Sequence, residues 1–399
     1  MAPPSANDEV STPIQSTPSK ARTIPEIKKS LGGLTQSASH PTPLVYSGTL
    51  DHYESFDLTS VIGREFPNLQ ITDILSDDAK LRDLAILVSQ RGVVFFRNQD
   101  INIEDQKVLG QKLGELTGKP ETSKLHKHAL SNSKRGIAVD ENGKLDDEVS
   151  VISSDVRSWP SLSNNYVTNK KSSCSSKESY IITDSPLQRS SLVKDGTQSG
   201  ITFERVPSDY AILKITKTPE DVGGDTLWAS GYEAFDRLSP VWQRFAEGLT
   251  ATHYQPNFNK VAAEHSLELL DEDRGAPENK GLDFTASHPV VRTNPVTGWK
   301  SLFGAGHQVH AGWIDNVTET ESEVIKAYFL KLIADNHDLQ VRFRWNQNDL
   351  AIWDNRSVFH TATNDYEGKR QGNRVVSLGE KPFYNPASKS RREALFGGI

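Results

Sequence analysis

The stretch WDNRSVFHTATNDYEGKRQGNRVVSLGEKPFY, residues 353–384, decides the fold expected for this chain. His360 stands just after a predicted strand, and Arg370 and Arg374 follow near the next strand, four residues apart with Gly372 between them. An arginine on a rigid strand can hold a carboxylate by paired hydrogen bonds. A histidine beside such arginines is consistent with a metal ion and an acidic cosubstrate. The spacing alone also fits a loop histidine with two solvated arginines, so both interpretations stay open.

Short strands and a few helices precede this block. Residues 340–345 alternate apolar and polar side chains, a short turn follows at 346–348, and residues 350–353 (LAIW) are interpreted as a second strand, which predicts a β-hairpin. Residues 76–92 carry an apolar stripe behind Ser76 as the expected N-cap, which predicts a helix, and Val93–Phe96 then predicts a buried strand. The mixture favours a mainly β fold with inserted helices, in the form of a β-sandwich or jelly roll.

Capping residues mark the start of three further helices. Ser230 precedes Glu233 by three residues, and Thr320 precedes Glu323 by the same spacing, as in a capping box. Ser239 is followed by a proline, which suits the first position of a helix. These patterns predict helices inserted between the strands, and we find no internal repeat.

Composition excludes several classes of protein. The 399 residues carry a formal net charge of −7, which gives no overall attraction to nucleic acid or to an anionic membrane. The single cysteine, Cys174, excludes an internal disulfide and a cysteine-based zinc site, and it suits a reducing compartment. No apolar run approaches the roughly 18 residues needed to span a bilayer. We therefore expect a cytoplasmic protein whose partner is a small-molecule substrate, with no nucleic acid and no membrane.

Four segments are expected along the chain. Residues 1–40 are rich in Pro, Ser and Thr and are predicted to be a disordered tail. One domain is predicted over 44–385, and residues 386–399 are expected to form a C-terminal tail. Inside the domain, residues 155–197 are dense in Ser, Lys and Asn and show no sustained periodicity. That segment is an insertion, a disordered loop, or not native coding sequence.

A second block, ITFERVPSDYAILKITKTPEDVGGDTLWASGYEAFDRLS, spans residues 201–239. The motifs GGDTLW at 223–228, HPVVRTNPVTG at 288–298 and SLF at 301–303 occur in an order that ends with the block quoted first. Together they resemble the iron(II)/2-oxoglutarate-dependent dioxygenases of the taurine/sulfonate type, especially the branch common in fungi. The resemblance runs from about Leu44 to Tyr384, apart from the serine-rich segment.

The resemblance implies a double-stranded β-helix (a cupin-like jelly roll) that uses Fe(II), 2-oxoglutarate and O2 to hydroxylate a small anionic substrate such as a sulfonate. It implies that His360 is the distal iron-binding histidine. Arg374 and Thr226 would hold the far carboxylate of 2-oxoglutarate, and Arg370 would lie near the sulfonate or the cosubstrate. His128 would contact the substrate. Family members are often oligomers, so a homo-oligomer is possible.

The chain departs from the family pattern at the metal site. A family member carries His-x-Asp before the segment ITFE, whereas here Gln198 occupies the histidine position and Gly200 the aspartate position. Asn294 also replaces a histidine that is usual in the HPVVRT motif. One histidine and one amide should hold Fe(II) poorly, because affinity and geometry both come from the set of three ligands.

Three explanations compete for this departure. Glycine at the acid position resembles the related halogenases, but those keep the proximal histidine, so this explanation is disfavoured. A second is a catalytically impaired homologue, a pseudoenzyme that keeps the fold. The third is a mis-spliced or frameshifted reading over 155–200, which we favour. Codons for residues 194–199, read two bases later, can encode Trp-His-Ser, and this would restore the missing histidine next to ITFE.

Overall fold

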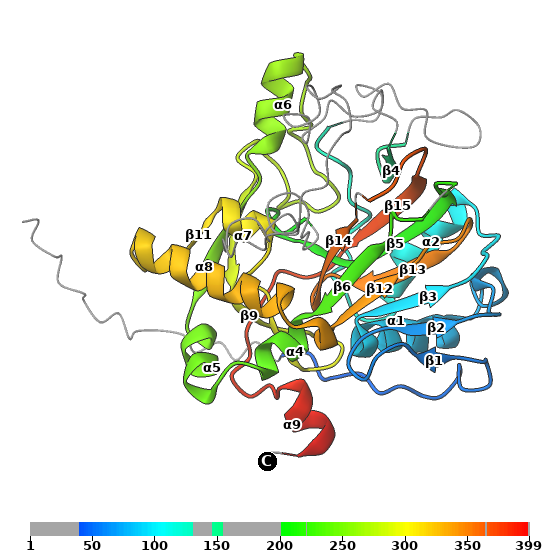
Figure 1. Ribbon diagram of the computed structural model, residues 1–399, viewed down its shortest axis with the longest axis horizontal. Coiled ribbons are helices and arrows are strands. Elements are labelled where there is room, and N and C mark those ends of the chain that lie inside the picture. The colour runs from blue at the N-terminus through cyan, green and yellow to red at the C-terminus, as the bar shows by residue number, and fades with distance from the viewer. Residues whose placement is uncertain (1–39, 131–145, 155–200, 221, 364, 398–399) are drawn as a thin grey trace, which may run out of the picture. The chain divides into compact units, whose positions relative to one another are not determined.

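The computed structural model describes residues 40–130, 146–154, 201–220, 222–363 and 365–397 (Figure 1). Gln198, Gly200 and the segment 155–197 lie outside the described residues, as do the first 39 residues of the predicted tail. The helices are α1 (Asp78–Arg91), α2 (Ile103–Glu115), α4 (Gly231–Asp236), α5 (Pro240–Glu247), α6 (Asn257–His265), α7 (His307–Ala311), α8 (Glu319–Ala334) and α9 (Arg391–Phe396), with 3-10 turns η1 (Ile71–Asp73) and η3 (His337–Leu339). The strands are β1 (Phe56–Asp57), β2 (Arg64–Phe66), β3 (Val93–Phe96), β4 (Val149–Ser153), β5 (Ser208–Lys217), β6 (Thr226–Ser230), β7 (Thr250–Tyr254), β8 (Thr285–Pro289), β9 (Val291–Thr293), β10 (Lys300–Leu302), β11 (Trp313–Ile314), β12 (Gln340–Phe343), β13 (Leu350–Asp354), β14 (Val358–Ala362) and β15 (Gln371–Leu378).

Two sheets carry the centre of the fold. The larger has the order β1-β2-β3-β13-β5-β15-β4, and the smaller has the order β12-β6-β14. One apolar cluster contains side chains from both sheets, so the sheets pack on a shared core. Its buried members are Ile62, Val93, Phe95, Ala211, Leu213, Ile215, Trp228, Val341, Phe343, Trp345, Ala351, Trp353, Val358 and Val376.

Helices α1 and α2 cover the other face of the larger sheet (Figure 1). Alternate residues of β3, β13 and β5 point to this side, because successive side chains of a strand face opposite ways. Val94, Ile212 and Ile352 pack there against helix residues such as Leu84 and Leu109. Both faces of these strands are therefore buried, which explains why they read as continuous apolar runs rather than as alternating ones.

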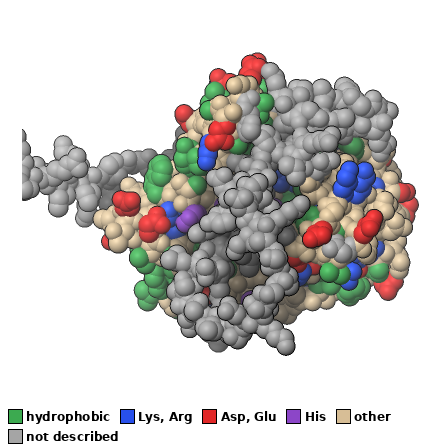
Figure 2. Space-filling model, turned by 45° about the horizontal axis from the view of Figure 1, so that its top comes forward, with side chains coloured by type: hydrophobic (Ala, Val, Ile, Leu, Met, Phe, Trp, Pro, Cys, Tyr) green, Lys and Arg blue, Asp and Glu red, His purple; other side chains and the backbone are tan. Residues whose placement is uncertain are grey.

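A further sheet, β11-β7-β8, and the pair β10-β9 lie outside the two central sheets. A second apolar cluster joins α4, α8 and the start of β9 through residues such as Phe235, Phe329 and Val291. The whole is a mixed α/β fold with several antiparallel sheets. No helix in the described ranges is both long and apolar enough to cross a membrane. Figure 2 shows acidic and basic side chains interspersed on the visible surface of these residues.

The predicted hairpin is wrong. Residues 340–343 form β12, which pairs with β6, whereas Leu350–Asp354 form β13, which pairs with β3 and β5. The connection between them crosses from one sheet to the other instead of turning back along the same sheet. Strand β12 alternates because one of its faces packs on the shared core, whereas every residue of β13 is buried. Neither pattern records whether the two strands pair with each other.

The predicted helices are present: Ser230 and Ser239 cap α4 and α5 as expected, and two other helices have shifted starts. Helix α1 is capped by Asp77 rather than Ser76, and its side chain accepts from the amides of Ala79 and Lys80. The capping box of α8 is formed by Thr318 and Glu321, two residues before the expected pair. In the segment expected to be a C-terminal tail, the structure has helix α9, with a capping box of its own.

Candidate active site

Three polar side chains continue the core-facing sides of three strands. They are Thr226 on β6, His360 on β14 and Arg374 on β15. Each stands two residues from an apolar member of the core between the sheets, and those members are Trp228, Val358 and Val376. Side chains two apart on a strand share a face, so the three polar groups line the same interior space beyond the core.

His360 has the properties of a neutral imidazole ligand. Burial, with the nearby charge of Arg374 and with His307, lowers its pKa to about 3. Its Nδ1 atom is buried and has no hydrogen-bond partner in the described part of the chain. The ring lies 5.0 Å from that of Trp353, centroid to centroid, and its strand pairs with β6 so that His360 stands opposite Trp228. An uncharged imidazole on a rigid strand suits coordination of a metal ion.

Arg374 carries a positive charge that no described residue neutralises. Its Nε is buried and makes no hydrogen bond, and burial alone lowers its pKa to about 10. The guanidinium therefore remains charged near neutral pH. A buried, unpaired charge is costly, so arginine in such a place is usually matched by an anion.

Arg370, rather than Arg374, lies beside Thr226. Its Nε donates to the carbonyl oxygen of Gly224 at 2.7 Å, and its Nη2 lies 3.4 Å from Thr226 Oγ1. The same hydroxyl oxygen accepts from Trp345 Nε1 at 3.0 Å. Burial lowers the pKa of Arg370, which has no ion pair among the described residues. The structure thus brings together one of the two arginines with the threonine assigned to the same ligand.

His128 lies away from these groups. Its ring packs edge-on against Phe258, at 5.2 Å between centroids, and its Nδ1 is 3.1 Å from both the amide nitrogen and the carbonyl oxygen of Leu130. Its contact with a substrate, implied by the resemblance, stays a prediction.

A buried ionic group that no sequence motif indicated lies next to Arg374. Glu204 binds Arg274 through two hydrogen bonds, at 2.5 Å to Nε and 2.9 Å to Nη2. The Nε2 of His126 lies 3.7 Å from the same carboxylate, and all three side chains are buried. The motif LHKHAL contains a usable clue, because Leu125 is apolar and His126 must then face the opposite way on an extended segment.

Residues 201–206 directly follow Gly200, and side chains far away in the sequence form hydrogen bonds with their polar groups. The ring nitrogen Nε2 of His288 donates to the carbonyl oxygens of Thr202 and Glu204, at 2.9 and 3.0 Å. Gln308 Oε1 accepts from the amide of Phe203 and from the hydroxyl of Thr202. That hydroxyl in turn accepts from His253 Nδ1 at 2.8 Å, which fixes His253 as the Nδ1–H tautomer.

Comparison with known proteins gives these residues a context. A model of the family described as "Taurine catabolism dioxygenase TauD, TfdA family" matches residues 54–154 and 172–376. The chain belongs to the TauD/TfdA dioxygenase family. The match resumes at residue 172, so it runs through the later part of the serine-rich segment.

Two fungal relatives match the TauD/TfdA chain over nearly their whole length. The α-ketoglutarate-dependent dioxygenase btcD of Neocamarosporium betae is 44% identical over 369 residues, covering 88% of this chain and 98% of that protein. The α-ketoglutarate-dependent dioxygenase oryG of Aspergillus oryzae is 43% identical over 364 residues, covering 90% and 97%. A crystal structure of a taurine dioxygenase from Burkholderia xenovorans shares the fold, with a TM-score of 0.57 at 21% identity over 84% of this chain and 92% of that one.

Membership of the TauD/TfdA family implies Fe(II) and α-ketoglutarate, and the two groups fit this chain differently. The unpaired guanidinium of Arg374 and the Thr226–Arg370 pair suit the carboxylates of α-ketoglutarate. For iron, the described residues contain no group of three His, Cys, Asp or Glu side chains that could hold a metal ion. The resemblance implies His360 as one ligand, and it aligns Gln198 and Gly200 with the positions of the other two. The metal site as encoded does not fit, so no reaction step is assigned to it.

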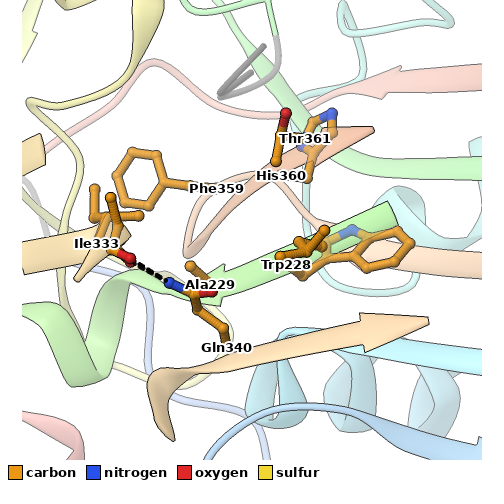
Figure 3. A pocket seen from close by; sticks show the side chains of 9 residues that line it. Trp228, Ala229, Ile333, Gln340, Phe359, His360 and Thr361 are labelled. Atoms are coloured by element: carbon orange, nitrogen blue, oxygen red, sulfur yellow. Dashed lines mark hydrogen bonds between the residues drawn. The ribbon is translucent and has the colours of Figure 1, made fainter. Parts of the chain in front are cut away.

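A small apolar pocket lies on the other side of the smaller sheet. Ile333, Ala229 and Phe359 line it, and Gln340 closes it by donating to the carbonyl oxygen of Ile333 at 2.6 Å. In Figure 3 the ring of His360 points away from the side where Phe359 and Ile333 gather. Trp228 and His360 are also among the residues that line the pocket, and their rings lie on the side away from Phe359 and Ile333.

Proposed function

We propose that this chain adopts the double-stranded β-helix of its family and is built to bind 2-oxoglutarate, as an α-ketoglutarate-dependent dioxygenase that hydroxylates a small anionic molecule. One observation carries the proposal. Two arginines, Arg374 on β15 and Arg370 directly before that strand, have no carboxylate partner among the described residues, and the neutral imidazole of His360 stands nearby. One of these unpaired cations can bind a carboxylate of the dicarboxylate 2-oxoglutarate, and the other can bind the anionic group of a substrate, both beside the proposed metal-binding histidine.

The contacts favour roles for the two arginines that are exchanged relative to the resemblance. Thr226 and Arg370 are adjacent, so they can hold one carboxylate together, and we assign them the far carboxylate of 2-oxoglutarate. Arg374 then remains for the anionic group of the substrate. Measurement of 2-oxoglutarate affinity by calorimetry separates the two assignments. Arg370→Ala should weaken it far more than Arg374→Ala, and the opposite order would restore the roles implied by the resemblance.

The substrate class is proposed as a sulfonate or a similar oxyanion. The family is named for taurine catabolism, and a sulfonate is a fixed anion that a guanidinium binds through paired hydrogen bonds. A panel of alkyl sulfonates, sulfate esters and carboxylates, scored by binding and by succinate release, tests this assignment. Binding confined to uncharged molecules would contradict it.

A second function is favoured by one specific observation. Gln198 and Gly200 leave the chain without two of three iron ligands, so it can act as a catalytically impaired homologue that binds 2-oxoglutarate without turnover. Succinate release by purified protein with Fe(II), ascorbate and sulfonates separates the two functions. Turnover by the chain as encoded would reject the impaired form.

The double variant Gln198→His, Gly200→Asp gives the complementary test. It should raise Fe(II) affinity steeply, because it restores the three-ligand set that gives iron both affinity and geometry. Unchanged iron binding would show that these two positions do not face His360. Sequencing of the transcript over codons 150–205 decides the origin of the change, since an uninterrupted message with these codons would exclude mis-splicing.

A further inference from the structure

His126 faces the same interior space as Arg374. An isolated bridge pairs Leu125 with Ser377 in antiparallel fashion, and the amide of His126 donates to the carbonyl oxygen of Val376 at 2.8 Å. Residues opposite each other in such a pair point to the same side of the sheet. Val376 belongs to the core between the two sheets, so His126 points inward as well.

Its neighbour confirms the direction. Leu125 packs with Val375 and Ile103 in a separate cluster, whose β15 member points to the opposite side from Val376. His126 is therefore a diagonal neighbour of Arg374, two residues along β15 from the residue it faces. Diagonal neighbours are about 7–8 Å apart, a span that one ligand of a few atoms can bridge.

The ring nitrogen of His126 lacks a full partner. Its Nε2 is buried and makes no hydrogen bond with a described residue, and a carboxylate oxygen of Glu204 lies 3.7 Å away. Both oxygens of that carboxylate are already bound by Arg274. This cluster consists of His126, Glu204, Arg274 and Arg374. It contains two guanidinium groups and one carboxylate, so one positive charge has no opposite charge within the cluster. An oxyanion placed between Arg374 and His126 would neutralise that charge and accept the free Nε2–H bond.

We propose that His126 is a second anion-binding residue, which holds a carboxylate or sulfonate group together with Arg374. The proposal rests on the proposed function, because it takes Arg374 as a ligand-binding residue of that same site. Glu204 and Arg274 act through His126 as positioning residues, since their ion pair lies against the ring and limits where it can turn.

Proton uptake should accompany binding. Burial lowers the pKa of His126, the charges of Arg274 and Arg374 lower it further, and Glu204 alone raises it. A bound anion offsets the charge of Arg374, so the pKa of His126 rises on binding and a fraction of a proton enters from solvent. A residue with only a structural role would not produce this linkage.

The test uses the full chain with EDTA and two probes, 2-oxoglutarate and propane-1-sulfonate, titrated by calorimetry in buffers of different ionisation enthalpy. His126→Phe keeps the ring volume and removes the hydrogen bond, whereas His126→Gln keeps an amide donor. Loss of one hydrogen bond to a charged group weakens binding roughly tenfold or more. We expect His126→Phe to lose that affinity for one probe, His126→Gln to recover part of it, and proton uptake to vanish in both variants. The exposed His337→Ala serves as the control.

The outcomes separate the two levels of the proposal. If Arg374→Ala leaves the affinity for both probes unchanged, the proposed site itself fails. If Arg374→Ala weakens a probe while His126→Phe binds it as tightly as the unaltered chain, with the same proton uptake, only the role of His126 is overturned. The probe that loses affinity in both variants identifies the anion, as the cosubstrate or as a sulfonate substrate. Thermal unfolding of His126→Phe shows whether an affinity loss reflects a damaged fold, and in that case the His126→Gln result decides.

Discussion

At the scale of single residues, the buried arginines of this chain divide into two kinds. Arg356 binds both oxygens of Asp354, at 2.7 and 2.8 Å, and Arg274 binds both oxygens of Glu204. These two are internal ion pairs. Arg374 has no such partner among the described residues, although it too faces the interior. An arginine left unpaired inside a protein destabilises the ligand-free fold, so its presence points to a ligand.

Replacement of each kind by methionine should have opposite effects on stability. Arg274→Met leaves the carboxylate of Glu204 buried and uncompensated, which should lower the free energy of unfolding by about 3–5 kcal/mol. Arg374→Met removes a charge that has no partner in the described part of the chain, so the ligand-free protein should lose little stability or gain some. Urea unfolding of both variants without ligand measures the difference. Equal destabilisation would mean that Arg374 has a structural partner after all.

The buried imidazole of His288 should make the free energy of unfolding depend on pH. Burial lowers its pKa from 6.5 to about 4. Below pH 6.5 the unfolded chain binds a proton at this residue and the folded chain does not, so stability falls as pH falls from 6.5 towards 4. The gap corresponds to about 3 kcal/mol. His288→Gln should flatten this part of the unfolding profile, while the exposed His337→Gln should leave it unchanged. A profile as steep in His288→Gln as in the unaltered chain would contradict the assignment.

At the scale of elements, the turn before β6 places Thr226, the threonine proposed to bind 2-oxoglutarate. Gly223 and Gly224 both have positive φ, at +104° and +69°, a region that side chains disfavour. A Cβ on Gly223 would lie 2.4 Å from the carbonyl oxygen of Asp365. The turn places the carbonyl oxygen of Gly224 where Arg370 Nε donates to it, and strand β6 begins two residues later at Thr226. Glycine is required here for both reasons.

A matched pair of alanine variants tests this turn. Gly118 has a φ of +86°, and a Cβ added there would meet no described atom within 4 Å, so Gly118→Ala reports backbone strain alone, about 1–3 kcal/mol. Gly223→Ala should cost about 1–3 kcal/mol more, because it adds a steric overlap. It should also weaken 2-oxoglutarate binding, since Arg370 loses its place. Equal stability losses, with unchanged affinity in Gly223→Ala, would show that the turn does not position the site.

Local patterns identified most elements and failed on their pairing. The apolar stripe of α1 and the caps of α4 and α5 are properties of the sequence itself, so those helices were predictable to within about a turn. The partners of β12 and β13 depend on which sheet each strand joins, and neither strand records this in its own residues. Strand pairing between segments far apart in the chain is set by the shared core, which local periodicity does not describe.

At the scale of the whole molecule, the site gathers residues that lie far apart in sequence. Thr226, His360 and Arg374 come from strands that a family motif could locate one by one. His126 could not be identified as a site residue from the sequence. Its partners, Glu204 and Arg274, come from two other segments, and only the fold brings the three together. The sequence also could not show that Thr226 contacts Arg370 and not Arg374. Side chains four residues apart on an extended segment point to the same side, and the sequence does not say which of the two lies opposite Thr226.

Ligand binding should stabilise the whole chain without metal. A ligand that binds only the folded state adds about 2.7 kcal/mol at a hundred times its dissociation constant. We expect 2-oxoglutarate to raise the melting temperature in the presence of EDTA. The control is 2-oxopentanoate, a keto acid of the same length that lacks the far carboxylate, and it should raise the melting temperature less. Equal effects of the two acids would remove the case for a carboxylate held by Thr226 and Arg370.

The anchoring of residues 201–206 has a consequence for the order of folding. The amides of Phe203 and Val206 donate to the side chains of Gln308 and Asn279, which come from more than seventy residues downstream. Residues 201–206 can reach their final conformation only after those later segments have folded. We therefore expect this segment to fold late and to unfold locally before the rest of the molecule. Hydrogen exchange at these two amides should be faster than in the paired strand β5. A change of sequence just before residue 201 can therefore disturb this segment while the rest of the fold still assembles.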